Sequence, residues 1–285
     1  MKILVTGAKG MLGTDLIDIL SKNHEIIATD IVDDENIVKL DITDLNDIKS
    51  KFNSLKPDIV INVAAFTDVD ACETNEDLAY KINAIGPKNL AIASENIDIP
   101  LLHISTDYVF GGDKHSYDED DETGPISAYG RTKLAGEILI KDHTDKYFIF
   151  RTAWLYGYNG NNFVKTMLEL SKTNDEISVV NDQHGSPTYT RDLSDAIAKI
   201  IETEKYGTYH ITNSGNCTWY EFTKEIFKQS NIDTKVKPVT TVEFPRPAPR
   251  PEYSILNNNK WKSEGFTPLR SYKDALNDYL KLELN

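Results

Sequence analysis

The first half of the chain alternates short apolar runs with segments whose apolar residues recur every three or four positions. The runs have the length of buried strands, and the periodic segments have the spacing of amphipathic helices. Strands are expected at 1–6, 25–29, 38–42, 58–65, 101–105 and 148–152, and helices from 11, over 48–55 and 78–93, and from 128. This α/β alternation predicts a Rossmann-like, doubly wound parallel sheet.

The second half predicts a smaller α/β lobe. Strands are expected at 177–180 and 209–212, and helices at 162–171, 192–203, 218–230 and 271–282. On the helix at 218–230, Trp219, Phe222 and Phe227 share an apolar face, which favours a role in the core. We therefore expect an NAD(P)-binding Rossmann domain over 1–153 and a mainly substrate-binding lobe over 154–285, with the chain free to re-enter the first domain.

A glycine-rich turn, 7–13, joins the first strand to the first helix. Its glycines permit a tight turn, a close approach of the backbone to a pyrophosphate, and close packing of the helix on the strand. The N-terminus of the helix then faces the anion. The turn predicts a dinucleotide cofactor, NADH or NADPH. The residues expected to hold it here are Gly7, Gly10, Met11, Leu12 and Gly13.

The next strands are expected to carry the remaining cofactor contacts. Asp30 ends the second strand about 20 positions beyond the glycines, where a carboxylate suits the ribose 2′-hydroxyl and repels a 2′-phosphate. This favours NADH, although Lys9 in the glycine turn weakens the preference. The small Ala64 and Ala65 would let the cofactor lie close. The further residues expected against the cofactor are Asp41, Ile42, Ala64, Ala65, Phe66 and Thr67.

Thr106 and Asp107 follow the strand at 101–105, at the edge of the sheet where ligands bind. Tyr129 and Lys133 lie four residues apart, on one face of the following helix. Because an ammonium favours a nearby phenolate, we expect Lys133 to lower the pKa of Tyr129 toward neutrality. Tyr129 would then exchange a proton with a carbonyl oxygen that Thr106 orients. A Tyr/Lys pair at this spacing is common in helices, and the glycine turn upstream strengthens its interpretation as a catalytic pair.

Charge and composition limit the kinds of partner that the protein is expected to bind. The formal net charge is −14, which disfavours binding to nucleic acid or to a membrane surface. No stretch approaches the ~18 apolar residues of a membrane span. Cys72 and Cys217 are far apart, and no Cys/His cluster has the spacing of a zinc site. We expect a cytoplasmic protein that binds neither nucleic acid, membrane nor metal.

Motifs along nearly the whole chain resemble those of the extended short-chain dehydrogenase/reductases. The turn at 7–13 and the segment 129–137 match the whole superfamily, whereas 105–110 and 151–157 resemble more narrowly the dTDP-4-dehydrorhamnose reductase family. Further matches lie at 62–70, 185–188, 207–210 and 250–251. The resemblance implies NAD(P)H-dependent reduction of the 4-keto group of a dTDP-4-dehydro-6-deoxy-L-sugar to dTDP-L-rhamnose, the last step of dTDP-rhamnose biosynthesis. It also implies that Lys133 bonds the nicotinamide ribose and that Tyr108 and Trp154 line the sugar pocket.

The segment 244–251 is rich in proline, which favours an extended backbone. It carries Arg246 and Arg250, and arginine matches phosphate oxygens in a bidentate manner. We expect this segment to hold the diphosphate of the dTDP-sugar; a solvated linker before the last helix is the alternative. The residues expected against the substrate are Thr106, Asp107, Tyr108, Tyr129, Trp154, Arg246 and Arg250.

Two other functions stay open. A nucleotide-sugar epimerase or dehydratase of the same superfamily would share the fold, although a dehydratase is expected to carry a glutamate where this chain has Tyr108. The regulatory subunit of methionine adenosyltransferase also resembles this family and binds NADP as a partner protein. The intact set of Thr106, Tyr129 and Lys133 favours catalysis. Monomer and homodimer are both open, and nothing in the sequence indicates a metal that bridges a dimer.

Overall fold

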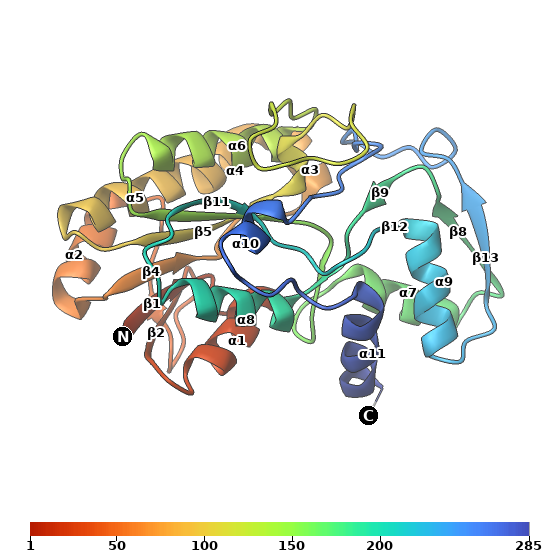
Figure 1. Ribbon diagram of the computed structural model, residues 1–285, viewed down its shortest axis with the longest axis horizontal. Coiled ribbons are helices and arrows are strands. Elements are labelled where there is room, and N and C mark those ends of the chain that lie inside the picture. The colour runs from red at the N-terminus through yellow and green to blue at the C-terminus, as the bar shows by residue number, and fades with distance from the viewer. Residues whose placement is uncertain (285) are drawn as a thin grey trace.

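A seven-stranded parallel sheet forms the centre of the protein (Figure 1). The structure is a computed structural model that describes residues 1–284. Its strand order is β11-β6-β5-β4-β1-β2-β3. The strands are β1 (Lys2–Thr6), β2 (Glu25–Asp30), β3 (Val38–Lys39), β4 (Ile59–Asn62), β5 (Leu101–Thr106), β6 (Tyr147–Thr152) and β11 (Gly207–His210). The chain runs outward in both directions from β1, which makes the β1–β4 boundary the switch point where such sheets bind ligands. The predicted Rossmann-like fold is confirmed.

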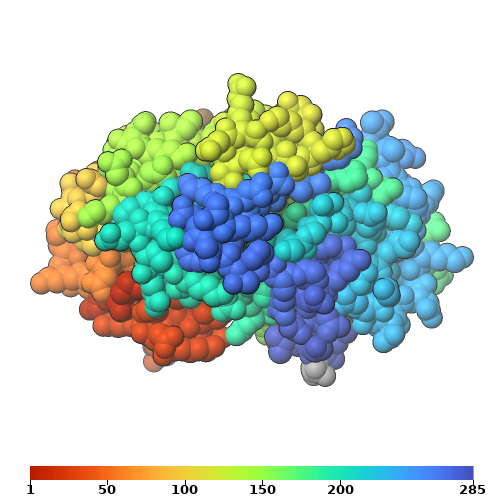
Figure 2. All heavy atoms as spheres, in the orientation of Figure 1, coloured from red at the N-terminus to blue at the C-terminus, as the bar shows by residue number. Residues whose placement is uncertain are grey.

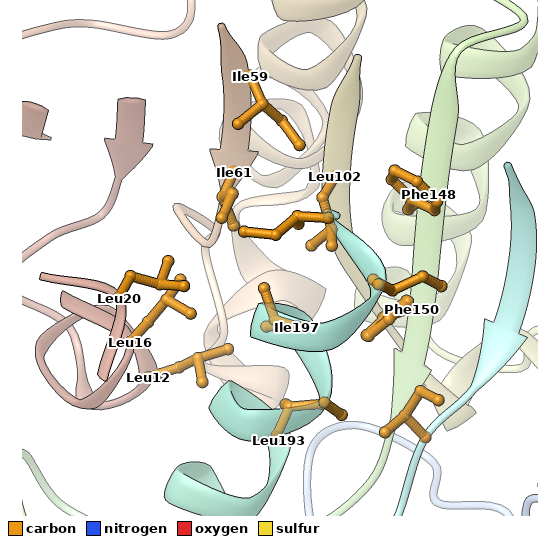
Figure 3. Close-up of a cluster of buried hydrophobic side chains, with 14 of the residues drawn as sticks. Leu12, Leu16, Leu20, Ile59, Ile61, Leu102, Phe148, Phe150, Leu193 and Ile197 are labelled. Atoms are coloured by element: carbon orange, nitrogen blue, oxygen red, sulfur yellow. The ribbon is translucent and has the colours of Figure 1, made fainter. Parts of the chain in front are cut away.

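Helices cover both faces of this sheet (Figure 1). One face carries α2 (Leu45–Leu55), α3 (Val69–Thr74), α4 (Glu76–Tyr80), α5 (Gly86–Asn96) and α6 (Ala128–Lys141). A π-helical segment, Lys81–Ile85, joins α4 to α5. The other face carries α1 (Met11–Leu20) and α8 (Thr190–Ile200). Figure 3 shows the core beneath these two helices, where Leu16 of α1 and Ile197 of α8 point toward Ile61 of β4.

The second lobe packs three helices against pairs of short strands. The helices are α7 (Phe163–Ser171), α9 (Trp219–Gln229) and α11 (Tyr272–Glu283). The strand pairs are β7 (Leu155–Tyr156) with β10 (Thr188–Tyr189), β8 (Glu176–Val180) with β13 (Lys235–Val239), and β9 (His184–Gly185) with β12 (Cys217–Thr218). Its own core is aromatic, with Tyr156, Phe222 and Tyr279 fully buried.

The chain beyond residue 153 returns to the first unit at three places. β11 extends the central sheet beside β6, and α8 packs on α1. The short helix α10 (Asn259–Ser263) contacts β11 and inserts Trp261, 1% exposed, into the main core. In Figure 2 this late part of the chain, in blue, lies across the middle of the molecule against the teal segment. The core of the first unit therefore contains residues from both sides of the predicted boundary at residue 153.

Two strands end earlier than predicted, each opposite the last residue of a neighbouring strand. β4 stops at Asn62, which pairs with Thr6, the last residue of β1. β3 stops at Lys39, which pairs with Asp30, the last residue of β2. The predicted extensions to Ala65 and Ile42 become loops. These loops place Ala64, Ala65, Asp41 and Ile42 at the carboxyl edge of the sheet.

Candidate active site

Two adjoining cavities open at the carboxyl edge of the sheet, with volumes of about 520 and 510 Å³. Gly10, Val63 and Ala65 belong to both linings, so the cavities meet there. The linings bring together the predicted cofactor residues Gly7, Gly10, Met11, Leu12, Gly13, Asp30, Asp41, Ile42, Ala64, Ala65 and Thr67. They also bring together the predicted substrate-facing and catalytic residues Thr106, Asp107, Tyr108, Tyr129, Lys133 and Trp154.

Phe66, Arg246 and Arg250 are the predicted site residues that these linings do not include. Phe66 packs instead with Cys72, Ala79 and Tyr129 in a small apolar cluster beneath α6. Its backbone is fixed by Asn83, whose side chain accepts from Phe66 N at 2.8 Å and donates to Phe66 O at 3.0 Å. Phe66 and Tyr129 thus pack against the same apolar cluster.

The glycine turn has the shape of an anion cradle. Gly7 has a φ of +66°, and a Cβ there would lie 2.8 Å from Ala64 N. A Cβ at Gly13 would lie 2.2 Å from Gly7 O, so this glycine lets α1 pack against the turn. Gly10, the N-cap of α1, has no such obstacle within 3 Å, and α1 carries no acidic residue in its first turn. The free amides at this helix N-terminus suit the pyrophosphate of a dinucleotide.

A carboxylate and an ammonium lie side by side in the lining of the first cavity. Asp30 accepts hydrogen bonds from Lys9 N at 3.0 Å and Ile31 N at 2.8 Å. The Lys9 ammonium donates to Asp34 at 2.7 Å. Asp30, whose carboxylate suits a ribose 2′-hydroxyl, and Lys9, whose ammonium suits a 2′-phosphate, therefore both line the first cavity.

Thr106 and Asp107 form one hydrogen-bonded unit at the end of β5. The Thr106 hydroxyl donates to Asp107 Oδ1 at 2.9 Å, and Tyr108 N donates to Thr106 Oγ1 at 3.2 Å. The Tyr129 phenol lies in the same cavity lining, where burial and the nearby charge of Asp107 both raise its pKa. Burial raises the pKa of Asp107 to about 6, against the opposing effect of its hydrogen bonds with Ser254 and Thr106. A protonatable carboxyl thus lies beside the predicted proton donor.

The expectation that Lys133 lowers the pKa of Tyr129 toward neutrality is wrong for the protein without a cofactor. Lys133 Nζ donates to Ile104 O at 2.6 Å and lies 3.3 Å from His103 Nε2. Burial raises the pKa of Tyr129 above its ordinary value, and burial lowers the pKa of Lys133 to about 8, partly opposed by the charge of Glu137. Both shifts follow from one cause, because a buried site disfavours the charged form of either group.

Stacked aromatic rings form the wall of the second cavity that faces the smaller lobe. Trp154 stacks on Trp219 with ring centroids 3.5 Å apart and an interplanar angle of 7°. Trp154 itself has a φ of +48°, and Gly185 leaves room for its ring, since a Cβ there would lie 2.3 Å from Trp154 Cε2. Trp219 and Phe163 both line the cavity, so assigning Trp219 to the core missed a site residue. The Thr218–Glu221 capping box marks the start of α9 at Trp219 but gives no signal that the Trp219 ring lines the cavity.

Both arginines of the proline-rich segment bind one carboxylate, Asp70 of α3. Arg246 Nη2 and Arg250 Nη1 each lie 2.5 Å from an Asp70 oxygen. Burial opposes ionisation of Asp70, but hydrogen bonds from Arg250 and Arg246 lower its pKa to about 2. Arg250 is largely buried and also interacts with Tyr108 of the second cavity. Sequence reasoning missed Asp70, because this contact joins positions 180 residues apart.

Residues 1–284 contain neither a helix of membrane-spanning character nor a cluster of metal-binding side chains. No helix in this range has both the length and the apolar character needed to cross a membrane. No group of three or more His, Cys, Asp or Glu side chains in the same range is arranged to hold a metal ion.

The family described as "RmlD substrate binding domain" matches residues 1–284. The Bacillus subtilis spore coat polysaccharide biosynthesis protein SpsK is 44% identical over 98% of this chain and 97% of its own length. A crystal structure of a dTDP-4-dehydrorhamnose reductase from Clostridium acetobutylicum is 51% identical, covers 100% of both chains and superposes with a TM-score of 0.95. The Bacillus anthracis dTDP-4-dehydrorhamnose reductase in complex with NADP is 44% identical over 99% of both chains, with a TM-score of 0.93. The resemblance seen in the motifs is confirmed, and the chain belongs to the RmlD substrate-binding-domain family.

Proposed function

We propose that this protein is an NAD(P)H-dependent oxidoreductase that reduces the 4-keto group of a dTDP-4-dehydro-6-deoxy-L-sugar to give dTDP-L-rhamnose, the last step of dTDP-rhamnose biosynthesis. The observation that carries the proposal is the position of Thr106, Tyr129 and Lys133 in the lining of the second cavity, which meets the glycine-turn cavity at Gly10. Relatives at 44–51% identity over nearly full length, two of them dTDP-4-dehydrorhamnose reductases, support it.

The residues present fit a dinucleotide cofactor, since the glycine turn offers amides and space where a Cβ would intrude. NAD(P)H supplies the hydride when it is bound. Gly10 and the N-terminus of α1 would hold the pyrophosphate. Asp30 or Lys9 would face the adenosine ribose, and Lys133 would bond the nicotinamide ribose.

The reducing step needs a proton at the oxygen of sugar C4, and Tyr129 is the donor that we assign. Its raised pKa keeps the phenol protonated at neutral pH, which is the form that a proton donor requires. Thr106 would orient the carbonyl oxygen. Trp154 and Trp219 would hold the sugar ring by apolar contact, with Asp107 and Tyr108 as polar contacts. Arg250 and Arg246 would bind the diphosphate through charge-assisted hydrogen bonds.

The decisive measurement is the loss of absorbance of reduced nicotinamide on adding a dTDP-4-keto-6-deoxy-L-sugar, with dTDP-L-rhamnose identified as product. Stoichiometric oxidation of the cofactor supports the proposal. An epimerase or dehydratase would convert a nucleotide sugar without net oxidation of added cofactor. A non-catalytic NAD(P)-binding protein would bind the cofactor and leave every sugar unchanged. Either result would overturn the assignment.

We further propose that the protein acts in the cytoplasm as a monomer or homodimer. Cys72 and Cys217 are unpaired and buried, which suits a reducing compartment. Light scattering on the purified protein would give the mass in solution, and a mass above that of two chains would contradict this proposal.

A further inference from the structure

A chain of four buried polar side chains runs beneath the site from β1 to α6. Thr6 Oγ1 lies 2.6 Å from Asn62 Oδ1, Asn62 Nδ2 lies 2.8 Å from His103 Nδ1, and His103 Nε2 lies 3.3 Å from Lys133 Nζ. Their exposed fractions are 1% for Thr6, 0% for Asn62 and His103, and 2% for Lys133. The proposed mechanism uses only Lys133 from this chain, so the other three groups need a separate explanation.

One direction of donation satisfies all of these atoms when Lys133 is a neutral amine. Ala64 N donates to Thr6 Oγ1 at 3.4 Å, and the Thr6 hydroxyl donates to Asn62 Oδ1. Asn62 Nδ2 then donates to His103 Nδ1, so the neutral imidazole carries its proton on Nε2. That proton points at Lys133 Nζ, which accepts it only if the nitrogen has a free lone pair.

The reverse direction satisfies Lys133, His103 and Asn62 when Lys133 is an ammonium. Lys133 donates to Ile104 O, as before, and also to His103 Nε2. The imidazole then carries its proton on Nδ1 and donates to the Asn62 carbonyl oxygen, once the amide has turned over. The Asn62 amide nitrogen donates to Thr6 Oγ1, and the Thr6 hydroxyl proton is left to face the first cavity, whose lining includes Thr6.

We propose that His103 is a positioning residue whose tautomer, together with the orientation of Asn62, switches with the charge of Lys133. The proposal rests on the proposed reductase function, in which Lys133 must hold the cofactor ribose and stay close to Tyr129. With these two hydrogen-bond sets, Lys133 gains or loses a proton while the His103 ring and the Asn62 amide keep their hydrogen-bond partners in both states. The reaction consumes a proton at Tyr129, and a lysine that changes charge at low cost suits the return of that proton.

The other charged and titratable groups around Lys133 do not provide this switch. Glu137, one turn along α6, acts on Lys133 by its charge and is itself bound to Arg151 at 2.8 Å. Tyr129 and Asp107 share the cavity lining with Lys133. His103 is the titratable group in hydrogen-bond range of Lys133 Nζ among residues 1–284, and burial keeps the pKa of its imidazole well below the ordinary value. It therefore stays neutral and responds by moving its proton between the two ring nitrogens.

The wild-type protein provides the first test. In cofactor-free protein labelled with ¹⁵N-histidine and ¹³C-lysine, NMR would follow the two ring nitrogens of His103 and the terminal carbon of Lys133 between pH 6.5 and 10. Lys133→Met and His103→Gln assign the signals. We expect the His103 nitrogen shifts to exchange their pattern with the same midpoint as Lys133, near pH 8. A His103 pattern that stays fixed while Lys133 titrates would overturn the proposal.

Variants provide the second test. His103→Leu removes the acceptor of a buried ammonium, so the Lys133 midpoint should fall by about one to two pH units. His103→Gln offers an amide oxygen and should return the midpoint toward the wild-type value. The matched control is His210→Gln, which changes an equally buried, neutral histidine that lies 3.4 Å from Arg151. A folded His103→Leu with an unmoved midpoint, or an equal shift in His210→Gln, would contradict the switch.

Enzyme assays on the same variants separate this proposal from the proposed function. The high-pH limb of kcat/KM should move with the Lys133 midpoint in each variant, which a purely structural role of His103 would not produce. If the NMR midpoints move but the wild type reduces no dTDP-4-keto-sugar, the proposed function fails and the switch stands. If the sugar is reduced while the limb and the midpoints stay in place, the switch fails and the function stands.

Discussion

Tyr129 lies in a site that disfavours its ionisation, and this decides which of its forms does the chemistry. Burial raises the pKa of its phenol above the ordinary value. A protonated phenol donates to a developing alkoxide and has no need of a low pKa in the resting protein.

Replacing Tyr129 by phenylalanine should therefore remove the proton donor and little else. We expect kcat to fall by roughly 10²-fold or more, with the affinity for NAD(P)H nearly unchanged. Steady-state assays give kcat, and fluorescence titration of the reduced nicotinamide gives the affinity. Tyr158→Phe, at an exposed tyrosine, is the matched control. Near-normal turnover in Tyr129→Phe would remove this residue from the donor role.

Arg250 and Arg246 differ in burial, and this difference should appear in their variants. The Arg250 side chain is 14% exposed and that of Arg246 is 51% exposed, although both bind Asp70. A charge-assisted hydrogen bond contributes roughly 1.5–3 kcal/mol, so Arg250→Ala should raise KM for the dTDP-sugar about 10- to 150-fold. Arg246→Ala should have a smaller effect because its contacts are more hydrated.

Steady-state kinetics at two salt concentrations would check the role of both arginines. KM of Arg250→Ala should depend less on salt than that of the parent, and cofactor affinity should stay the same. If both variants keep KM within about twofold, which is under ~0.5 kcal/mol, the proline-rich segment is a linker and other groups hold the phosphates.

At the scale of elements, the glycine turn separates effects on folding from effects on binding. A Cβ at Gly10 would meet Gly7 O at 3.1 Å, and Gly10 has an ordinary φ of −73°. Gly10→Val should therefore fold and fill the space that a pyrophosphate needs, which abolishes cofactor binding. Gly13→Val should destabilise the protein, because its Cβ would lie 2.2 Å from Gly7 O.

Circular dichroism and cofactor titration check this pair of glycine variants. Gly124→Val is the control, since no heavy atom lies within 4 Å of its Cβ position. A folded Gly10→Val that binds NAD(P)H as tightly as Gly124→Val would show that the turn does not hold the pyrophosphate.

The loop after β2 should tune the choice between NADH and NADPH through Lys9. Asp34→Ala releases the Lys9 ammonium, so kcat/KM for NADPH relative to NADH should rise by up to about fivefold, the size of an exposed ion pair. Lys9→Ala should shift the ratio the opposite way. Lys146→Ala, which breaks an exposed pair with Asp98 away from the site, is the control. Equal ratios in all three variants would leave the preference to Asp30 alone.

The elements that the sequence predicted well are those with strong local patterns. The apolar runs placed β1, β5 and β6 to within a residue or two, because buried parallel strands need continuous apolar side chains. β13 was missed, since Lys235, Lys237 and Pro238 break the apolar pattern on an edge strand. The Asp70–arginine cluster and the Trp154–Trp219 stack were missed for another reason: each joins distant parts of the chain, and local spacing carries no signal for such pairs.

At the scale of the molecule, the site lies between two units, and the second half of the chain contributes residues to the core of the first unit. Tyr129 and Lys133 come from the first 153 residues, whereas Trp154, Phe163 and Trp219 come from the rest. α8 and β11 complete the first unit from the second half of the sequence. The chain therefore fixes the two walls of the site relative to each other by sharing secondary structure, not only by packing two finished surfaces together.

A fragment of residues 1–153 should consequently fail to fold on its own. Figure 3 shows Leu193 and Ile197 of α8 over the same core that α1 covers, and Leu193, Ala196, Ile197 and Ile200 are at most 2% exposed. Burial of one large aliphatic side chain stabilises by about 1.5–3 kcal/mol, so Leu193, Ile197 and Ile200 together contribute about 4.5–9 kcal/mol. That sum is comparable with the entire stability of a typical domain, about 5–15 kcal/mol.

Urea unfolding of this fragment, followed by circular dichroism, should show no cooperative transition, whereas the full chain should show one. As a control, Leu282→Ala in the full chain removes an exposed leucine of α11 and should leave the transition in place. Ile197→Ala in the full chain should lower the unfolding free energy by about 2–5 kcal/mol, because it opens a cavity in the shared core. A fragment that unfolds cooperatively and still binds NAD(P)H would instead establish residues 1–153 as an independent domain.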